Sequence, residues 1–382
     1  MSPLYMFALG ITAMMTVFAF IGCVAYLYWH HPSNRKRPND DLSFPYADEP
    51  STPTGVEPNQ GKLKLINDSE LTIMGILGAG AFGIVHKGVW CPDDNPKIQI
   101  PVAIKELSDA CASESEKPER EKNFLEEAFN MASVNHQCLV RLLAVCMAKK
   151  MLLITQLMPH GSLEEYLKKN KPYIHAKHML LWSKQIAEGM QYLESKRIIH
   201  RDLAARNVLV HSPHQVRITD FGLAKMLDIN QTHHYLEKGK MPFKWLAIES
   251  IKFRVFTHES DVWSFGVTIW EILMYGKKPF EGMRAEEFAY TLECGKRLTQ
   301  PPICTLELYM KLLACWMADP KSRPTFKSLK EDFEKMCRDP PRYIVIKQGK
   351  AEKNCEKSYQ DGQLSPPSPV CCAVGSRPLT CY

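Results

Sequence analysis

Apolar and polar positions divide the chain into four stretches of different character. Residues 4–29 carry no charged side chain, whereas residues 30–62 are rich in Pro, Asn, Asp and Ser. Residues 63–346 alternate between short apolar runs and amphipathic segments, as a folded domain does. Residues 347–382, which include "SPPSPVCCAVGSRP", return to low hydrophobicity. We therefore expect an apolar helix, a linker, one large folded domain and a disordered tail.

The first apolar stretch predicts a transmembrane helix over residues 4–29. At about 1.5 Å per residue, a helix of this length exceeds the roughly 30 Å hydrocarbon core of a bilayer. Arg35, Lys36 and Arg37 follow it, so the positive-inside rule predicts an N-terminus outside and the remainder in the cytosol. A cleaved signal peptide is the alternative, but a basic n-region is lacking and the apolar run is too long. We expect a single-pass plasma-membrane protein with a juxtamembrane linker at 30–62.

Within residues 63–346 the pattern changes from strands to helices along the chain. The runs "LTIMGILG", "GIVHKGVW", "IPVAIKEL" and "MLLITQLM" are β-branched and typical of strands. Between them, "REKNFLEEAFNMASV" places Phe124, Leu125, Ala128 and Met131 on one helical face. Two later segments, "HMLLWSKQIAEGMQYLESK" and "SDVWSFGVTIWEILMYG", predict long helices. The pattern predicts an α+β fold with a small β-rich lobe (63–157) and a larger, mainly helical lobe (158–346).

The composition is that of an ordinary globular protein, and it argues against two classes of protein. The chain is 45% hydrophobic and 24% charged, which is ordinary for a globular protein, and its net charge of +6 is too mild to indicate nucleic-acid binding. Its 13 cysteines form neither a C-x-x-C pair nor a cluster at metal-ligand spacing. We interpret them as reduced thiols rather than a disulfide framework.

The stretch "LGAGAFGIV" is the first candidate for chemistry. Gly78, Gly80 and Gly83 follow the G-x-G-x-x-G spacing, which dinucleotide-binding folds also use. In those folds a helix begins within the glycine run. Here the residues from Ile84 to Trp90 are β-branched and aromatic, so they favour a hairpin whose glycine tip lies over phosphates. An ordinary glycine-containing turn is the alternative.

Lys105, in "VAIK", lies in an apolar strand where an unpaired ammonium would be costly to bury. It needs an anionic partner, and Glu127 on the amphipathic helix is the candidate. Glu126 points about 100° away on that helix and is expected in solvent. A surface ion pair between Lys105 and Glu106 is the alternative interpretation.

The stretches "HRDLAARN" and "TDFGLA" supply the remaining polar groups. Asp202 can accept the proton of an incoming hydroxyl. Asn207 and Asp220 offer the hard oxygen ligands that Mg²⁺ prefers. Glycine loop, V-A-I-K, H-R-D-x-x-x-x-N and D-F-G occur in this order along the chain, and the ordered set resembles the protein-kinase signature. The resemblance implies a bilobal protein-kinase fold with ATP as substrate and Mg²⁺ as cofactor.

Further segments narrow the resemblance. "LAARN" and "MPFKWLAIES" resemble tyrosine kinases, which implies that Pro242 to Trp245 support a substrate tyrosine and that Arg206 contacts the phenol or the loop around Asp202. "ITQLMPHGSLEEYL" and "QPPICTLELYMKLLACWM" resemble the ErbB (epidermal growth factor receptor) family.

The ErbB resemblance implies roles for individual residues. The catalytic set comprises Asp202, Lys105, Arg206 and Asn207, with Asn207 and Asp220 as metal ligands. The ATP site comprises Leu77, Gly78, Gly80, Gly83, Val85, Ala103, Lys105, Glu127, Thr155 (the gatekeeper), Gln156, Met158, Leu209 and Asp220. Asp261 would brace the catalytic loop. Tyr235 and the Glu249–Arg323 pair would be regulatory.

The resemblance also implies activation by asymmetric dimerisation, homo- or heteromeric, with other ErbB kinases. Leu306, Leu313 and Met317 would form the activator face, and Leu63 and Leu65 the receiver face. Protein tyrosines would be the substrates. No ectodomain precedes the apolar segment, so we expect no ligand binding by this chain. SH2 or PTB adaptors are further candidate partners, although Tyr359 and Tyr382 lack a YxxM or NPxY context.

Some positions depart from the active members of the family. Ser162 stands where they carry a cysteine, and "HKGVW" and "DPPRYIVIK" resemble the kinase-impaired branch. That branch lacks the catalytic aspartate and the helix glutamate, whereas Asp202 and Glu127 are present here. Two hypotheses follow: an active membrane-anchored tyrosine kinase, or a catalytically weak partner that activates another kinase through its large lobe.

Overall fold

The computed structural model describes residues 63–80, 83–93, 97–106, 117–148, 150–236 and 241–346. The predicted transmembrane helix at 4–29, the linker at 30–62 and the tail at 347–382 lie outside these residues. Among the residues that the structure does describe, no helix is both long and apolar enough to cross a membrane.

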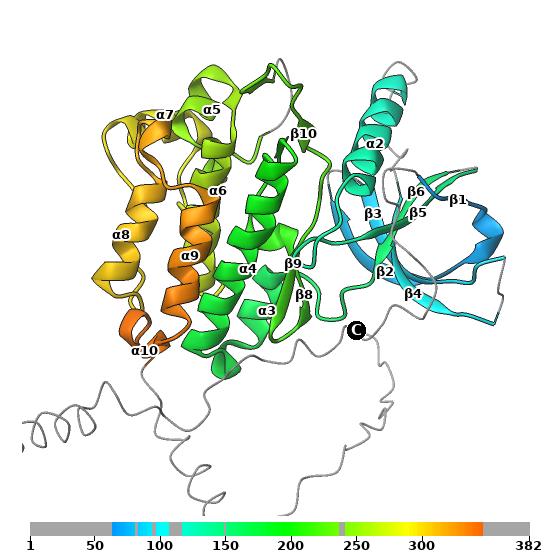
Figure 1. Cartoon of the computed structure of the whole chain (residues 1–382), viewed down its shortest axis with the longest axis horizontal. Coiled ribbons are helices and arrows are strands. Elements are labelled where there is room, and N and C mark those ends of the chain that lie inside the picture. The colour runs from blue at the N-terminus through cyan, green and yellow to red at the C-terminus, as the bar shows by residue number, and fades with distance from the viewer. Residues whose placement is uncertain are drawn as a thin grey trace, which may run out of the picture. The chain divides into compact units, whose positions relative to one another are not determined.

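The small lobe is built on one six-stranded sheet (Figure 1). Its spatial order is β1–β5–β6–β4–β3–β2; β1 runs parallel to β5, and all other neighbours are antiparallel. The strands are β1 (Leu65–Ile66), β2 (Leu71–Gly80), β3 (Gly83–Trp90), β4 (Ile100–Glu106), β5 (Leu142–Met147) and β6 (Met151–Gln156). Val102 and Ile104 of β4 are fully buried, as alternation in a half-covered strand requires.

Helix α2 (Lys117–Ala132) packs against this sheet through the face that the sequence predicts. Phe124, Ala128 and Met131 are buried, and Leu125 is partly buried beside them. The same helix carries Glu127, which is also buried. Packing of the apolar stripe therefore fixes the direction in which this carboxylate points.

A short 3₁₀ turn, η1 (Asp68–Glu70), ties β1 to the rest of the small lobe. The buried carboxylate of Glu70 accepts hydrogen bonds from Trp90 Nε1 at 3.1 Å and from the Asn67 backbone N–H at 2.8 Å. These bonds hold the pKa of Glu70 below its usual range although burial opposes them.

The large lobe is mainly helical (Figure 1). Its helices are α3 (Leu163–Lys169), α4 (Ala176–Ser195), α5 (Ile248–Phe253), α6 (His258–Leu273), α7 (Ala285–Glu293), α8 (Leu306–Cys315), α9 (Phe326–Met336) and α10 (Pro340–Tyr343), with 3₁₀ turns η3 (Lys171–Tyr173), η4 (Ala205–Asn207), η5 (Phe243–Trp245) and η6 (Pro320–Ser322). Three antiparallel strand pairs complete it: β7 (Ile198–Ile199) with β10 (Lys225–Met226), β8 (Val208–Ser212) with β9 (Gln215–Ile218), and β11 (His234–Tyr235) with β12 (Val255–Phe256).

Helix α6 forms the centre of the large lobe, and its residues from Ser260 to Leu273 are all buried. Thr257 caps its N-terminus by accepting a hydrogen bond from the Ser260 backbone N–H at 3.2 Å. At Gly266, a Cβ atom would lie 2.7 Å from Trp316 Nε1, so a larger residue would push away the end of α8. Close packing on all sides makes α6 a rigid base for the loops above it.

Hydrogen bonds join the two lobes on the side of β9. The Val140 backbone N–H donates to the Ile218 carbonyl at 2.9 Å, and the Ile218 N–H donates to the Cys138 carbonyl at 2.8 Å. The buried guanidinium of Arg217 donates to Gln156 Oε1 at 2.5 Å. The β-rich small lobe and helical large lobe fit the predicted bilobal fold.

Candidate active site

Lys105 brings together residues from both lobes. It lies on β4, opposite Val85 of β3 and Leu153 of β6. Its Nζ atom lies 2.7 Å from Glu127 Oε1 and 3.2 Å from Asp220 Oδ1. Burial alone would lower the pKa of Lys105, but the two carboxylates raise it above its usual range. The ammonium therefore remains charged inside the protein.

Asp220 reaches Lys105 from a turn that directly follows β9. Its backbone adopts a left-handed conformation (φ 64°), which is unusual for a residue other than glycine. Phe221 is buried beside the His200 ring, with the ring centroids 5.6 Å apart. Burial would raise the pKa of Asp220, but Lys105 lowers it below its usual range. The turn thus delivers an ionised carboxylate to the lysine.

Asp202 lies in the loop between β7 and β8 and is buried. Asn207 Nδ2 donates to the Asp202 carbonyl at 2.7 Å and to its Oδ2 at 2.8 Å. The Arg206 guanidinium pairs with the other carboxylate oxygen, Oδ1. Burial raises the pKa of Asp202 to about 6, against the opposing effect of Arg206. A fixed carboxylate titrating near neutrality suits the acceptance of a proton from a hydroxyl.

Helix α6 holds the backbone of this loop with two buried carboxylates. Asp261 Oδ2 accepts from the His200 N–H at 2.7 Å, and Oδ1 accepts from the Arg201 N–H at 2.9 Å. Glu271 Oε2 accepts from the Ala205 N–H at 3.0 Å. The sequence singles out Asp261 but misses Glu271, whose signal is a carboxylate within the apolar stretch "VTIWEIL".

Arg206 also contacts the segment proposed to support the substrate. Its guanidinium carbon lies 4.4 Å from the centroid of the Trp245 ring. Sequence reasoning leaves open whether Arg206 contacts a substrate phenol or the loop around Asp202. In this structure it contacts Asp202 and Trp245.

The glycine segment forms the end of a hairpin between β2 and β3. Gly78 pairs with Val85, and Gly80 pairs with Gly83, whose φ of 137° suits glycine. A Cβ atom at Gly78 would meet nothing within 4 Å, so the backbone is open to a ligand there. The remaining adenine-site residues predicted from the sequence lie on adjoining strands and on the segment that connects the lobes. Ala103 pairs with Thr155, and Leu209 bridges to Ser162.

In the same region, Met158 is buried, whereas Leu77 is 53% exposed. Thr155 Oγ1 donates to the Ala103 carbonyl at 3.4 Å. The Gln156 side chain accepts from Arg217, and its backbone N–H donates to the Arg141 carbonyl at 3.2 Å.

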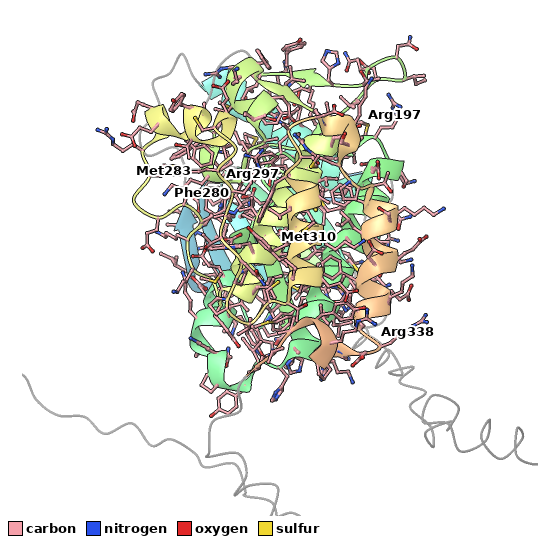
Figure 2. The ribbon with its side chains drawn as sticks, turned by 90° about the vertical axis from the view of Figure 1, so that its left-hand side faces the viewer. Arg197, Phe280, Met283, Arg297, Met310 and Arg338 are labelled. Atoms are coloured by element: carbon pink, nitrogen blue, oxygen red, sulfur yellow. The ribbon has the colours of Figure 1, made fainter. Side chains whose placement is uncertain are left out.

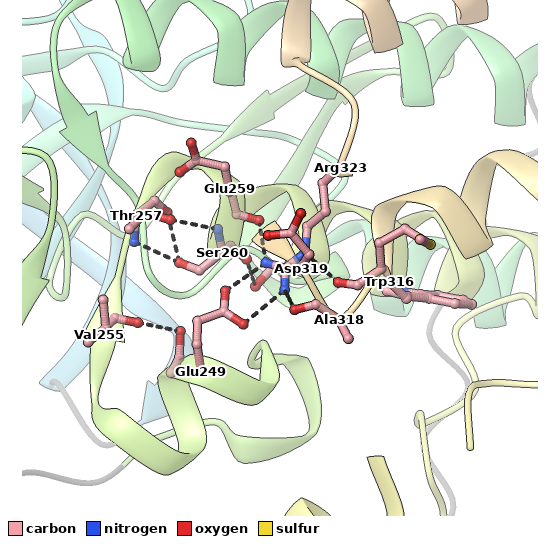
Figure 3. A network of polar contacts seen from close by, with 12 residues as sticks. Glu249, Val255, Thr257, Glu259, Ser260, Trp316, Ala318, Asp319 and Arg323 are labelled. Atoms are coloured by element: carbon pink, nitrogen blue, oxygen red, sulfur yellow. Dashed lines mark hydrogen bonds and ion pairs between the residues drawn. The ribbon is translucent and has the colours of Figure 1, made fainter. Parts of the chain in front are cut away.

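The predicted regulatory residues lie in two places. Tyr235, on β11, is 61% exposed and pairs with Val255, while its neighbour His234 pairs with Phe256. Glu249 and Arg323 form a two-pronged ion pair, with Nη1–Oε1 at 2.6 Å and Nη2–Oε2 at 2.8 Å (Figure 3). This pair ties α5 to the segment between α8 and α9.

The predicted dimer-interface residues differ in exposure. Leu65, Leu306 and Met317 are exposed, whereas Leu63 and Leu313 are partly buried against the core. Sequence analysis does not single out Met310, which is 56% exposed on α8 (Figure 2). It follows Leu306 by one helical turn, so the helical period would have revealed it.

Glu126, which we expect in solvent, has a side chain that is 40% exposed. It also has a partner that the sequence does not predict, because its carboxylate lies 3.2 Å from Lys225 Nζ on β10. The lysine comes from 99 positions further along the chain, so the helix geometry used for the expectation could not reveal this partner.

Comparison with known proteins places this arrangement in a family. Residues 71–333 match the family model described as "Protein tyrosine and serine/threonine kinase". The chain belongs to this family. Its kinase domain is of the ErbB tyrosine-kinase type, because it is 46–51% identical to receptors of that group.

Three relatives illustrate the similarity. The chain is 48% identical to the epidermal growth factor receptor of Apis mellifera over 92% of its own length and 27% of the relative's. It is 51% identical to the human receptor tyrosine-protein kinase erbB-4 over 78% of its length and 22% of the relative's. It is 46% identical to the mouse receptor tyrosine-protein kinase erbB-2 over 84% of its length and 24% of the relative's. The chain thus spans about a quarter of the length of these relatives.

Proposed function

We propose that this chain transfers the γ-phosphate of ATP to tyrosine hydroxyls of protein substrates. The observation that carries the proposal is the position of Lys105, whose Nζ bonds at once to Glu127 of α2 and to Asp220 of the large lobe. A protein kinase needs this lysine–glutamate pair and the metal-binding aspartate in place together.

The roles proposed for the protein groups follow from their positions. Lys105 and the backbone N–H groups around Gly78, Gly80 and Gly83 bind the phosphates. Leu77, Val85, Ala103, Thr155, Gln156, Met158 and Leu209 surround the adenine. Asp202 orients the tyrosine hydroxyl and accepts its proton, with Arg206 and Asn207 fixing the carboxylate. Positioning and charge neutralisation supply most of the catalysis in phosphoryl transfer.

The residues present fit a magnesium ion. Both hydrogen bonds given above for Asn207 use its Nδ2, which leaves the Oδ1 oxygen for a cation. Asp220 supplies an ionised carboxylate, and Mg²⁺ prefers hard oxygen ligands of this kind. When bound, the ion would neutralise charge on the phosphate oxygens.

We further propose the setting in which this kinase acts. The apolar segment 4–29 anchors it in the plasma membrane in a single pass, with its N-terminus outside and the kinase domain in the cytoplasm. Homo- or heterodimerisation with ErbB kinases activates it, because Leu306 of α8 and Met317, just beyond the end of α8, are exposed apolar side chains. Phosphorylated tyrosines, beginning with Tyr235, would order the chain around Tyr235 or recruit SH2 or PTB adaptors.

The test compares the wild type with Asp202→Asn on liposomes supplied with Mg-ATP. Phosphate at Tyr235, read by mass spectrometry, is expected in the wild type and not in the variant. Binding of a non-hydrolysable ATP analogue should remain within twofold in both, which separates lost chemistry from lost folding. If neither protein is phosphorylated while both bind the analogue, the proposed activity is refuted.

The second candidate function is that of an allosteric partner with weak catalysis of its own. The exposed apolar face of α8 favours it, because such a face can press on another kinase without using the active site. Leu306→Arg should then abolish activation of a co-expressed ErbB kinase, whereas Asp202→Asn should not. Tyr290→Arg, on the exposed surface of α7, is the matched control. Unchanged partner phosphorylation with Leu306→Arg contradicts this role.

A further inference from the structure

Glu271 links two segments that sequence analysis treats separately. It lies in the last turn of α6 and is 2% exposed. Its Oε2 atom accepts from the Ala205 backbone N–H at 3.0 Å and from Trp245 Nε1 at 2.8 Å. Ala205 belongs to the turn η4 that carries Arg206 and Asn207, and Trp245 ends η5, the proposed tyrosine platform. One carboxylate oxygen therefore touches both segments.

Four residues form a closed cycle: Glu271 bonds to Trp245, Arg206 lies over Trp245, and Ala205, the chain neighbour of Arg206, bonds back to Glu271. Glu271 holds the edge of the Trp245 indole, and the Arg206 guanidinium lies over its ring at 4.4 Å. Arg206 in turn pairs with Asp202. A shift of Trp245 would therefore disturb Asp202, whose carboxylate is proposed to receive the proton. Helix α6 holds this cycle in place through Glu271.

Core packing alone does not explain a glutamate at this position. A buried carboxylate is costly unless its hydrogen bonds are made, and an apolar residue would fill the space without that cost. Burial raises the pKa of Glu271 to about 7; among charged neighbours, Arg206 of η4 opposes this and Glu164 of α3 adds to it. The carboxylate lies where one of its oxygens accepts from two donors.

We propose that Glu271 is a positioning residue that locks the tyrosine platform at Trp245 to the catalytic loop at Ala205. It fixes the separation between a substrate hydroxyl and Asp202. The inference rests on the proposed kinase function, because the platform has meaning only for a tyrosine substrate.

The experiment compares Glu271→Met, which keeps the length of the side chain without the acceptor, with Glu271→Gln, which keeps an acceptor oxygen. Steady-state kinetics with a tyrosine peptide and with ATP give each KM separately. Glu271→Met should raise the peptide KM and lower kcat, with a combined loss on the order of tenfold in kcat/KM, because the Ala205 N–H and the Trp245 indole both lose their acceptor. The KM for ATP should stay within twofold, and Glu271→Gln should recover most of the loss.

Thr268→Val is the matched control, because Thr268 is also buried on α6 but its hydroxyl donates within the helix, to the Ser264 carbonyl at 2.8 Å. It should leave the peptide KM unchanged. Trp245→Phe removes the indole donor without altering α6, and should reproduce the rise in peptide KM even if Glu271→Met fails to fold.

Hydrogen exchange of the segment around Ala205 supplies a readout that does not need activity. Exchange should be faster in Glu271→Met than in Glu271→Gln, and this result stands even if the wild type transfers no phosphate. Equal exchange in the two variants, or an equal rise in the KM values for peptide and ATP, overturns the proposal.

Discussion

Replacing Arg323 with leucine should destabilise the kinase domain more than most single substitutions. The Arg323 side chain is 0% exposed, and its partner Glu249 is 13% exposed. Besides the two bonds to Glu249, the guanidinium donates to the Glu259 carbonyl at 2.9 Å (Figure 3). It also donates to the Met317 carbonyl at 2.9 Å. The change leaves a carboxylate without its counter-ion, and breaking a buried pair in this way costs about 3–5 kcal/mol in free energy of unfolding.

For a domain of this size, that loss corresponds to a fall in Tm of about 6–10 °C at roughly 2 °C per kcal/mol. Thermal unfolding followed by circular dichroism measures it. Arg323→Lys keeps the charge but not the two-pronged geometry, so its Tm should fall by about half as much. Arg284→Leu is the control, because Arg284 pairs with Glu287 at the surface with 76% and 55% of the two side chains exposed. It should shift Tm by less than about 1 °C. Equal shifts for Arg323→Leu and Arg284→Leu would refute the reasoning.

Two further results are expected. Asp202 must be ionised to accept a proton, and its pKa is raised to about 6. The kcat for a tyrosine peptide should therefore be flat from pH 7 to 8 and should fall about tenfold per pH unit well below pH 6. A kcat that is unchanged down to pH 5 contradicts this prediction. Cysteine-directed ATP-site inhibitors should not modify Ser162, whereas the Ser162→Cys variant should gain one adduct, measured by intact mass. The variant should also lose about 1 kcal/mol in free energy of unfolding, because Ser162 caps α3 by accepting from the Glu165 N–H. An adduct on Ser162 in the wild type would contradict this prediction.

The sequence predicts contacts well where one local pattern determines them. A lysine in a buried strand needs an anion, and the helical phase that buries Phe124 and Ala128 also turns Glu127 inward. The structure places Lys105 and Glu127 in contact. The predicted strands and long helices follow from the same periodicity.

Contacts that depend on how distant elements pack could not be derived in this way. The bonds that Glu271 makes depend on where α6 lies beneath two loops, one of them 66 positions away. The approach of Asp220 to Lys105 depends on a left-handed backbone conformation, which aspartate adopts more often than most residues but only as an exception. The Glu126–Lys225 pair likewise arises only once β10 lies near α2.

The two carboxylates of α6 restrict how this gene can change in length. Asp261 and Glu271 are ten positions apart, so the helix sets them about 15 Å apart at 1.5 Å per residue. Deleting a single codon between them would rotate one carboxylate about 100° relative to the other, and either His200 and Arg201 or Ala205 and Trp245 would lose their acceptor. Insertions and deletions should therefore be tolerated in surface loops of this domain and removed by selection within α6, because this helix fixes the spacing of the two carboxylates that hold the catalytic loop.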